Sequence, residues 1–227
     1  MRTLVLFLVL LAFLSACIPA NQQKDDAPKV VVEEASRQPS FYPHETGLSW
    51  EYLPNGASLD ADRLFQRIEG PKVINGEIYI VTRSAGRGTD TSSFRQYRDD
   101  GVYFAREEGP GYILSLNPPI KEFPASADLR VGQSWEGQSE AHITFTETGA
   151  SRKDVNFITQ YRYTVVDKRQ VRLEAGQFEV YVINLESRRL VEGQEAEVLH
   201  QEVWFSPFVG EVRNEADQVL IATTAKP

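Results

Sequence analysis

The chain has 227 residues, a formal net charge of −8 at pH 7 and a single cysteine. Acidity of this size argues against a nucleic-acid partner and against a polybasic contact with anionic lipid head groups. With one cysteine, no internal disulfide bond can form.

The first sixteen residues contain the three parts of a secretory signal peptide. Arg2 supplies a positive charge, Leu4 to Leu14 form an unbroken apolar run, and small residues follow. The run is too short to be retained as a membrane span, because a spanning helix needs about 20 apolar residues. We therefore expect residues 1–16 to be removed by cleavage between Ala16 and Cys17.

The four residues Leu14-Ser15-Ala16-Cys17 resemble the lipobox of bacterial lipoproteins, in which diacylglycerol alkylates the thiol before cleavage. The resemblance implies that Cys17 is the lipidation site and that acyl chains such as palmitate hold the protein at a membrane. The alternative is an ordinary signal peptide followed by a chance cysteine. Ile18 stands where lipoproteins of the inner membrane often have Asp, so the resemblance favours the periplasmic face of the outer membrane in a diderm organism.

Residues 17–40 are expected to form a flexible tether behind the lipidated cysteine. They are rich in proline and polar residues, and their one apolar cluster is Val30-Val31-Val32, so they cannot bury enough surface to fold alone. A coil of about 22 residues would span roughly 25 Å. The alternative is that the three valines add an edge strand to the body.

Residues 41–227 are expected to form a single β-domain. Apolar residues alternate, or nearly so, in 77–82, 94–98, 142–146 and 156–166, which predicts strands with one wet face. In 178–190 both phases are apolar, which predicts a strand covered on both faces. Asn75-Gly76, Asp99-Asp100-Gly101 and Ala175-Gly176 are hairpin signals. A short turn at 60–65 is the one helical feature expected.

This pattern predicts an all-β domain in which about ten antiparallel strands form a curved meander. A barrel or half-barrel removes most of the open sheet edges and is the first choice. A two-sheet β-sandwich is the alternative.

The body contains an internal echo. Gly47-Leu48-Ser49-Trp50-Glu51 and Gly132-Gln133-Ser134-Trp135-Glu136 share Gly, Ser, Trp and Glu in register. After each motif, a turn glycine starts a long predicted strand, at Gly76 in the first half and at Gly176 in the second. A second turn glycine then starts a short predicted strand, at Gly101 and at Gly210. The echo favours two related β-meanders in one body, with Trp50 and Trp135 as buried anchors.

Three motifs recur in a known group of proteins. They are the run from Tyr42-Pro43 through Gly47-Leu48-Ser49-Trp50-Glu51-Tyr52, the run Val171-Arg172-Leu173-Glu174-Ala175-Gly176-Gln177-Phe178, and the run Val203-Trp204-Phe205-Ser206-Pro207-Phe208-Val209-Gly210. They resemble uncharacterised bacterial envelope lipoproteins in which such motifs frame a curved antiparallel sheet. The resemblance covers most of 41–214 and departs at Glu174, where the group has proline. It implies architecture and supplies no catalytic residue.

The serines and histidines form no known catalytic motif. Ser134 lies in a segment one residue too long for the Gly-x-Ser-x-Gly nucleophile elbow, and Ser49 lacks the second glycine. His44, His142 and His200 lack metal-ligand spacing, and a meeting of the last two across strands is a weak metal hypothesis. We predict no catalytic residue, no metal site and no cofactor.

Two further patterns have structural explanations. Asp99-Asp100 belongs to a turn, and Glu107 and Glu108 face opposite sides of a strand, so neither pair can act on one substrate bond. The segment 84–93 lacks the ending and the following helix of a phosphate loop. We expect a long mobile hairpin loop there, which would be a contact site for a partner.

The sequence therefore favours a membrane-anchored, non-enzymatic binding or assembly module of the cell envelope, with an envelope protein or an apolar ligand as its partner. A carrier of an apolar ligand and a lipid-anchored hydrolase are the alternatives. The interior would distinguish them, because converging polar residues favour the enzyme, a dry apolar cavity favours the carrier, and a filled interior leaves only surfaces.

Overall fold

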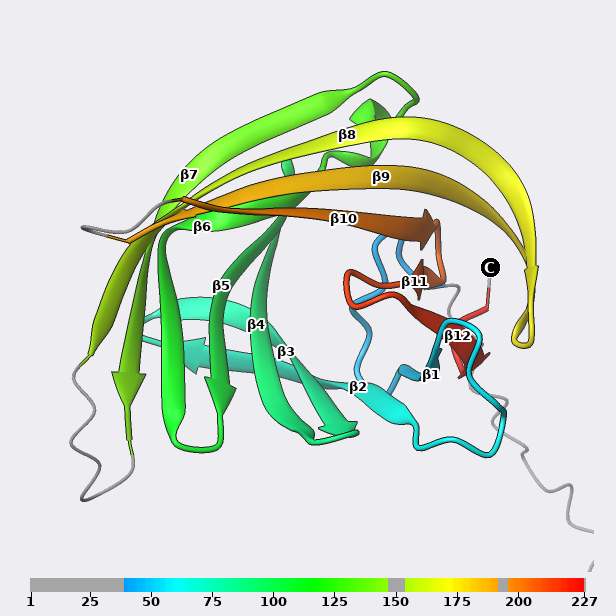
Figure 1. Ribbon diagram of the computed structural model, residues 1–227, viewed down its shortest axis with the longest axis horizontal. Helices are drawn as coiled ribbons and strands as arrows, with labels where there is room; N and C mark the ends of the chain where they lie inside the picture. Colours follow the sequence, from blue (N-terminus) through cyan, green and yellow to red (C-terminus); the bar gives the residue numbers. More distant parts are fainter. Residues whose placement is uncertain (1–38, 147–153, 192–195, 227) are drawn as a thin grey trace, which may run out of the picture. The chain divides into compact units, whose positions relative to one another are not determined.

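The computed structural model describes residues 39–146, 154–191 and 196–226. Within these residues, twelve antiparallel strands follow one another around a closed barrel, and the first strand pairs with both the second and the last (Figure 1). The barrel expected from the alternating pattern is confirmed, and the sandwich is not found. The predicted signal peptide, the lipobox, Val30–Val32 and all but the end of the predicted tether lie outside the described residues.

The strands are β1 Ser49–Pro54, β2 Leu64–Ile74, β3 Glu77–Gly86, β4 Thr89–Arg98, β5 Gly101–Gly109, β6 Tyr112–Pro124, β7 Ser134–Phe145, β8 Val155–Leu173, β9 Gly176–Leu190, β10 Glu197–Ser206, β11 Gly210–Arg213 and β12 Gln218–Thr223. A short 3-10 helix, η1 Ser126–Asp128, precedes β7. In the described part of the chain, no helix is long and apolar enough to cross a membrane.

Two expectations about local structure are wrong. The segment 60–65 is not a helical turn: it is irregular up to Arg63, and β2 begins at Leu64. The segment 84–93 is not a long loop but the paired ends of β3 and β4, joined by Arg87 and Gly88. Both turn residues have positive φ, 54° and 78°, as in the two-residue turns that match the twist of a hairpin.

The two halves of the barrel begin with the same hydrogen bonds. The Gly47 amide donates to the Ile68 carbonyl over 2.8 Å, and the Gly132 amide donates to the Val165 carbonyl over 2.8 Å. The register shifts directly after Ile68 in β2 and directly after Val165 in β8. Since β1 and β7 lie six strands apart in a ring of twelve, the sequence echo marks equivalent places in the two halves.

The core consists of two clusters, and β9 contributes to both. Val180 and Val182 are fully buried in one cluster, with Trp50 and Leu220. Ile183, 1% exposed, belongs to the other. Because neighbouring residues of a strand face opposite ways, β9 is covered on both faces, as the sequence predicted.

An aromatic cluster joins the start of the body to the barrel wall. The rings of Phe41 and Tyr42 lie 5.9 Å and 5.2 Å from the ring of Phe205, and Phe123 lies 4.8 Å from Phe205. We call these four residues the aromatic plug. Tyr42, Phe123 and Phe205 of this plug also line a hollow in the interior.

Candidate functional site

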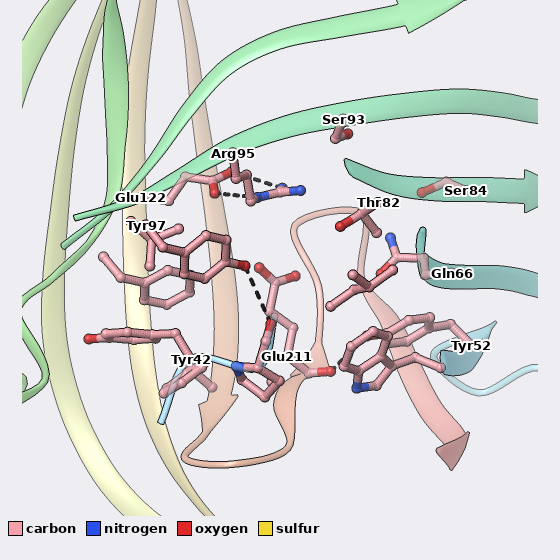
Figure 2. A pocket seen from close by; sticks show the side chains of 17 residues that line it. Tyr42, Tyr52, Gln66, Thr82, Ser84, Ser93, Arg95, Tyr97, Glu122 and Glu211 are labelled. Atoms are coloured by element: carbon pink, nitrogen blue, oxygen red, sulfur yellow. Dashed lines mark hydrogen bonds and ion pairs between the residues drawn. The ribbon is translucent and has the colours of Figure 1, made fainter. Parts of the chain in front are cut away.

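The interior of the barrel holds a cavity of about 450 Å³, which we call the lumen. Residues from β2 to β6 and from β8 to β12 line it, so it is enclosed by nearly the whole ring of strands. A smaller hollow of about 120 Å³ adjoins it beside Tyr42 of the plug and shares Ser93, Arg95 and Glu211 with it (Figure 2). The lumen is within the size range of ligand sites, which run from about 300 to 1,000 Å³.

One wall of this space consists of hydroxyl groups from two neighbouring strands. Thr82 and Ser84 of β3 and Thr91 and Ser93 of β4 line the lumen or the adjoining hollow. Because side chains alternate along a strand, these residues point inward while Arg83 and Ser92 point outward and bond to one another. The interior is therefore polar on this side.

Arg95 continues the inward row of β4 and forms an ion pair with Glu122 of β6. The Nε and Nη2 atoms of Arg95 donate to the two carboxylate oxygens of Glu122 over 2.6 Å and 3.0 Å. Burial alone would lower the pKa of Arg95, but the attraction of Glu122 outweighs burial and raises it further above its ordinary value. This bidentate pair is a fixed, electrically balanced part of the lining.

Glu211 of β11 has no such partner. Its backbone carbonyl accepts a hydrogen bond from the Tyr52 hydroxyl over 2.9 Å, and its side chain points into the hollow (Figure 2). The carboxyl group makes no hydrogen bond or ion pair with any residue that the structure describes. Burial, with repulsion from Glu215 and Glu122, raises the pKa of Glu211 to about 8, although Arg95 opposes the rise.

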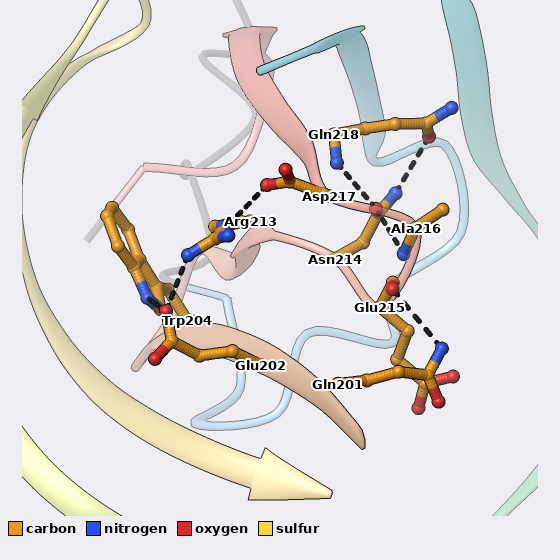
Figure 3. Close-up of polar contacts among 9 residues, drawn as sticks. All are labelled: Gln201, Glu202, Trp204, Arg213, Asn214, Glu215, Ala216, Asp217 and Gln218. Carbon is orange, nitrogen blue, oxygen red and sulfur yellow. Dashed lines mark hydrogen bonds and ion pairs between the residues drawn. The ribbon is translucent and has the colours of Figure 1, made fainter. Parts of the chain in front are cut away.

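Glu215 lies in the loop between β11 and β12, which the side chain of Asn214 holds together. The Asn214 Oδ1 atom accepts from the amides of Ala216 and Gln218, both over 3.1 Å (Figure 3). The side chain of Glu215 is accessible to solvent, but many protein atoms surround it, and it lines the lumen. Burial and the charge of Glu122 raise the pKa of Glu215 to about 7, against the attraction of Arg95.

The ring of strands is incomplete beside this loop. On one side, β10 pairs with β9 from Glu197 onward. On its other side, β10 pairs with β11 only through Trp204, Phe205 and Ser206. In the remaining stretch, the Gln201 amide donates to the Glu215 carbonyl over 3.2 Å. A second hollow on the outer side of β8 to β10, of about 600 Å³, shares Gln201 and Glu215 with the lumen. At this gap the lumen and the outer hollow therefore share a wall.

Nearby charges hold the rim of the gap. Arg213 of β11 donates to Glu202 over 2.5 Å and to Asp217 over 2.7 Å, and its guanidinium lies 5.0 Å from the ring of Trp204 (Figure 3). All four residues are on the outer side or the hairpin loop, so Arg213 is committed to the rim. It does not line the lumen.

The serines and histidines considered from the sequence lie apart from this site. The hydroxyls of Ser49 and Ser134 lie 3.3 Å and 3.0 Å from the hydroxyls of Thr224 and Thr164. His142 is on β7 and His200 on β10, which are not neighbouring strands, so the two do not meet.

His44 bonds to the Tyr42 carbonyl through Nδ1 over 2.9 Å. Among the described residues, no group of three or more His, Cys, Asp or Glu side chains could hold a metal ion.

The acidic pairs behave as their local geometry requires. Asp99 and Asp100 form the turn between β4 and β5. Glu108 pairs with Arg106, whereas Glu107 lines the lumen and accepts a hydrogen bond from the Tyr112 hydroxyl over 2.6 Å. The two glutamates therefore face opposite sides of β5, as the sequence predicted.

The residues that matter in this site were missed in the sequence. Arg95, Glu122 and the segment that carries Glu211 and Glu215 are far apart in the chain, and the closure of the barrel brings them together. One local signal existed: the alternating row Thr89, Thr91, Ser93, Arg95 places polar groups on one face of a strand, which is unusual for an interior face.

Comparisons with known proteins supply a likeness of fold. No protein-family model and no curated protein matches the chain significantly. A Bacteroides fragilis protein described as exported, with a YmcC-like fold, has 12% identity and a TM-score of 0.48, over 82% of this chain and 99% of that one. A Parabacteroides distasonis protein described as a lipoprotein has 12% identity and a TM-score of 0.49, with the same coverage. At this similarity neither transfers a function, and the motif resemblance stays a prediction.

Proposed function

We propose that this chain is a lipid-anchored protein of the bacterial cell envelope whose barrel binds a small hydrophilic ligand in its lumen without transforming it. The carboxyl group of Glu211 supports this proposal most directly. It lies inside the barrel and faces a cavity, and no described residue pairs with it. Its oxygens keep access to the cavity, so a ligand in the lumen can reach them, and such a ligand would offset the repulsion from Glu122 and Glu215.

The lining argues for a hydrophilic ligand rather than an apolar one. Hydroxyls of β3 and β4 and the Arg95–Glu122 pair face the same space. An apolar ligand would remove water from these groups and return no hydrogen bonds, which is unfavourable. This proposal differs from the carrier of an apolar ligand, which the sequence left open as an alternative.

A lipid-anchored hydrolase is the second candidate, because polar groups converge and the pKa of Glu211 is raised to about 8, where a carboxyl group can act as a general acid. Acid–base catalysis also needs a second group that activates water or a nucleophile. The pKa of about 7 at Glu215 makes it the candidate for that role. Conversion of a bound compound, detected as a change in its mass, would favour this alternative.

The anchor is tested separately from the lumen. Wild-type protein labelled with palmitate in cells is expected to carry the label and to fractionate with membranes, and Cys17→Ser is expected to lack it. Label retained by Cys17→Ser would contradict lipidation at this residue.

The lumen is tested by thermal unfolding of the full-length protein in detergent with cationic, anionic and neutral hydrophilic compounds. A ligand that binds only the folded barrel at one hundred times its Kd adds about 2.7 kcal/mol of stability, so Tm should rise with one of these classes. Ser93→Phe fills the lumen and should abolish the rise. Ser92→Phe places the same ring on the outer face and should retain it. A panel in which no compound shifts Tm would contradict the proposed function.

A further inference from the structure

The charges that line the lumen are strongly unbalanced. One arginine and four glutamates face it, namely Arg95, Glu107, Glu122, Glu211 and Glu215. Arg95 is committed to Glu122 by two hydrogen bonds, and Glu107 accepts from the Tyr112 hydroxyl. Glu211 and Glu215 therefore have no cationic partner among the described residues.

Enclosure makes this imbalance costly. A carboxylate removed from bulk water and placed near other carboxylates is destabilised by lost hydration and by repulsion. Within the chain itself, Glu211 relieves this cost by retaining a proton, so its pKa is raised. A bound cation would relieve the same cost by supplying the missing opposite charge.

The dimensions and walls of the lumen favour an organic cation over a metal ion. Calcium needs six to eight oxygen ligands close around it, and the described residues form no such group. A cavity of about 450 Å³ is far larger than a bare ion. Tyr161, Tyr163 and Phe104 line it beside the hydroxyl wall, and aromatic faces attract ammonium groups within about 6 Å.

We infer that the lumen binds an organic amine, with Glu211 and Glu215 as the counter-ions of its ammonium groups and the hydroxyls of β3 and β4 as acceptors of their N–H bonds. The gap between β10 and β11 lets the ligand enter beside Glu215. This inference rests on the proposed function and names the chemical class of its ligand.

Spermidine is the probe, titrated into the full-length protein in detergent while heat or tryptophan fluorescence is recorded, since Trp50 lines the adjoining hollow. We expect saturable binding by wild type and at least tenfold weaker binding by Glu211→Gln and by Glu215→Gln. Glu69→Gln removes an equal charge from an exposed position outside the lumen and should bind as wild type does. Unfolding of each variant is recorded first, so that a loss of fold is separated from a loss of affinity.

The controls separate failure of this inference from failure of the proposed function. Binding of citrate or sorbitol, lost in Ser93→Phe, without binding of spermidine would overturn the cationic ligand and leave a hydrophilic lumen site. Calcium binding tighter than spermidine binding and lost in Glu211→Gln would overturn the organic cation in favour of a metal. Equal weakening by Glu69→Gln would show non-specific attraction to an acidic protein and would also overturn the inference. Absence of all binding would overturn both proposals.

Discussion

The two halves of the barrel share a framework but line its interior differently. Each begins with a positive-φ glycine, a tryptophan and a register shift in the next strand. Strands β3 and β4 then turn hydroxyls and Arg95 inward, whereas their counterparts β9 and β10 turn Leu185, Ser187 and Gln201 inward. Turn and register residues thus specify the pairing of strands, and the inward residues are free to differ. The hydroxyl wall and the Arg95–Glu122 pair come from the first half, whereas Glu211 and Glu215 come from the second.

The contrast extends to one pair of equivalent positions. Tyr52 of β1 pairs with Leu64 of β2, and Gly137 of β7 pairs with Tyr161 of β8. The tyrosine of this residue pair therefore lies on the first strand of one half and on the second strand of the other. The space above Gly137 is filled from across the strand pair, as is common where a glycine interrupts a strand.

The largest expected effect comes from the two tryptophans. Trp50 is 6% exposed and donates to the Val209 carbonyl over 2.6 Å, whereas Trp135 is only partly buried and donates to the Lys121 carbonyl over 2.9 Å. Trp50→Ala should therefore lower the free energy of unfolding by about 3 to 5 kcal/mol, and Trp135→Ala by less. Denaturant unfolding measures both. Equal losses would show that the halves are energetically alike.

The second effect concerns Gly137. A Cβ atom there would lie 2.7 Å from Cζ of Tyr161, so Gly137→Ala should cost about 1 to 3 kcal/mol by crowding the ring. In a Tyr161→Leu background, the alanine should cost almost nothing, because the ring is gone. A double-mutant cycle on the free energy of unfolding measures this coupling. The same cost in both backgrounds would place the strain in the backbone instead.

A smaller effect is the dependence of stability on pH. Glu211 has a pKa of about 8 in the folded barrel and 4.5 as its ordinary value, so folding takes up a proton between these pH values. Its contribution to stability is complete below about pH 4.5 and is lost as the pH rises through about 8. The charged and titratable groups that face it are Tyr52, Arg95, Tyr97, Glu122, Tyr163 and Glu215.

Glu211→Gln should consequently be more stable than wild type at about pH 9. The gain should be on the order of 1 kcal/mol, because Glu211 is only partly buried and solvent screens much of the shift in its pKa. The stability of this variant should still fall as the pH rises, but less steeply, because the pKa of Glu215 is raised to about 7. Thermal melts from about pH 5 to about pH 9 test this. A wild-type Tm that rises over this range would contradict the raised pKa.

Sequence alone predicted most of the framework and little of the site. Alternation located the strands around residues 77–82 and 156–166, and the glycine and tryptophan pattern located the equivalent starts of β1 and β7. These signals are local. The sequence of 84–93 favours a loop because its serines and threonines show no apolar alternation. That alternation is absent because β3 and β4 turn these polar side chains toward the lumen. Glu211 and Arg95 could not be paired with a cavity before the closure of the ring was known.

That closure joins the first strand of the body to the last. The Thr223 hydroxyl donates to the Ser49 carbonyl over 2.9 Å, across 174 residues of chain. A ribosome makes β1 early and β12 at the end, so no partial chain can complete the ring, and contacts of such long range form slowly. Until β12 arrives, one edge of β1 presents unpaired backbone groups that can pair with another chain. The barrel is therefore most exposed to misassembly during its synthesis and transport, and a chaperone that shields the β1 edge would have the greatest effect in that interval.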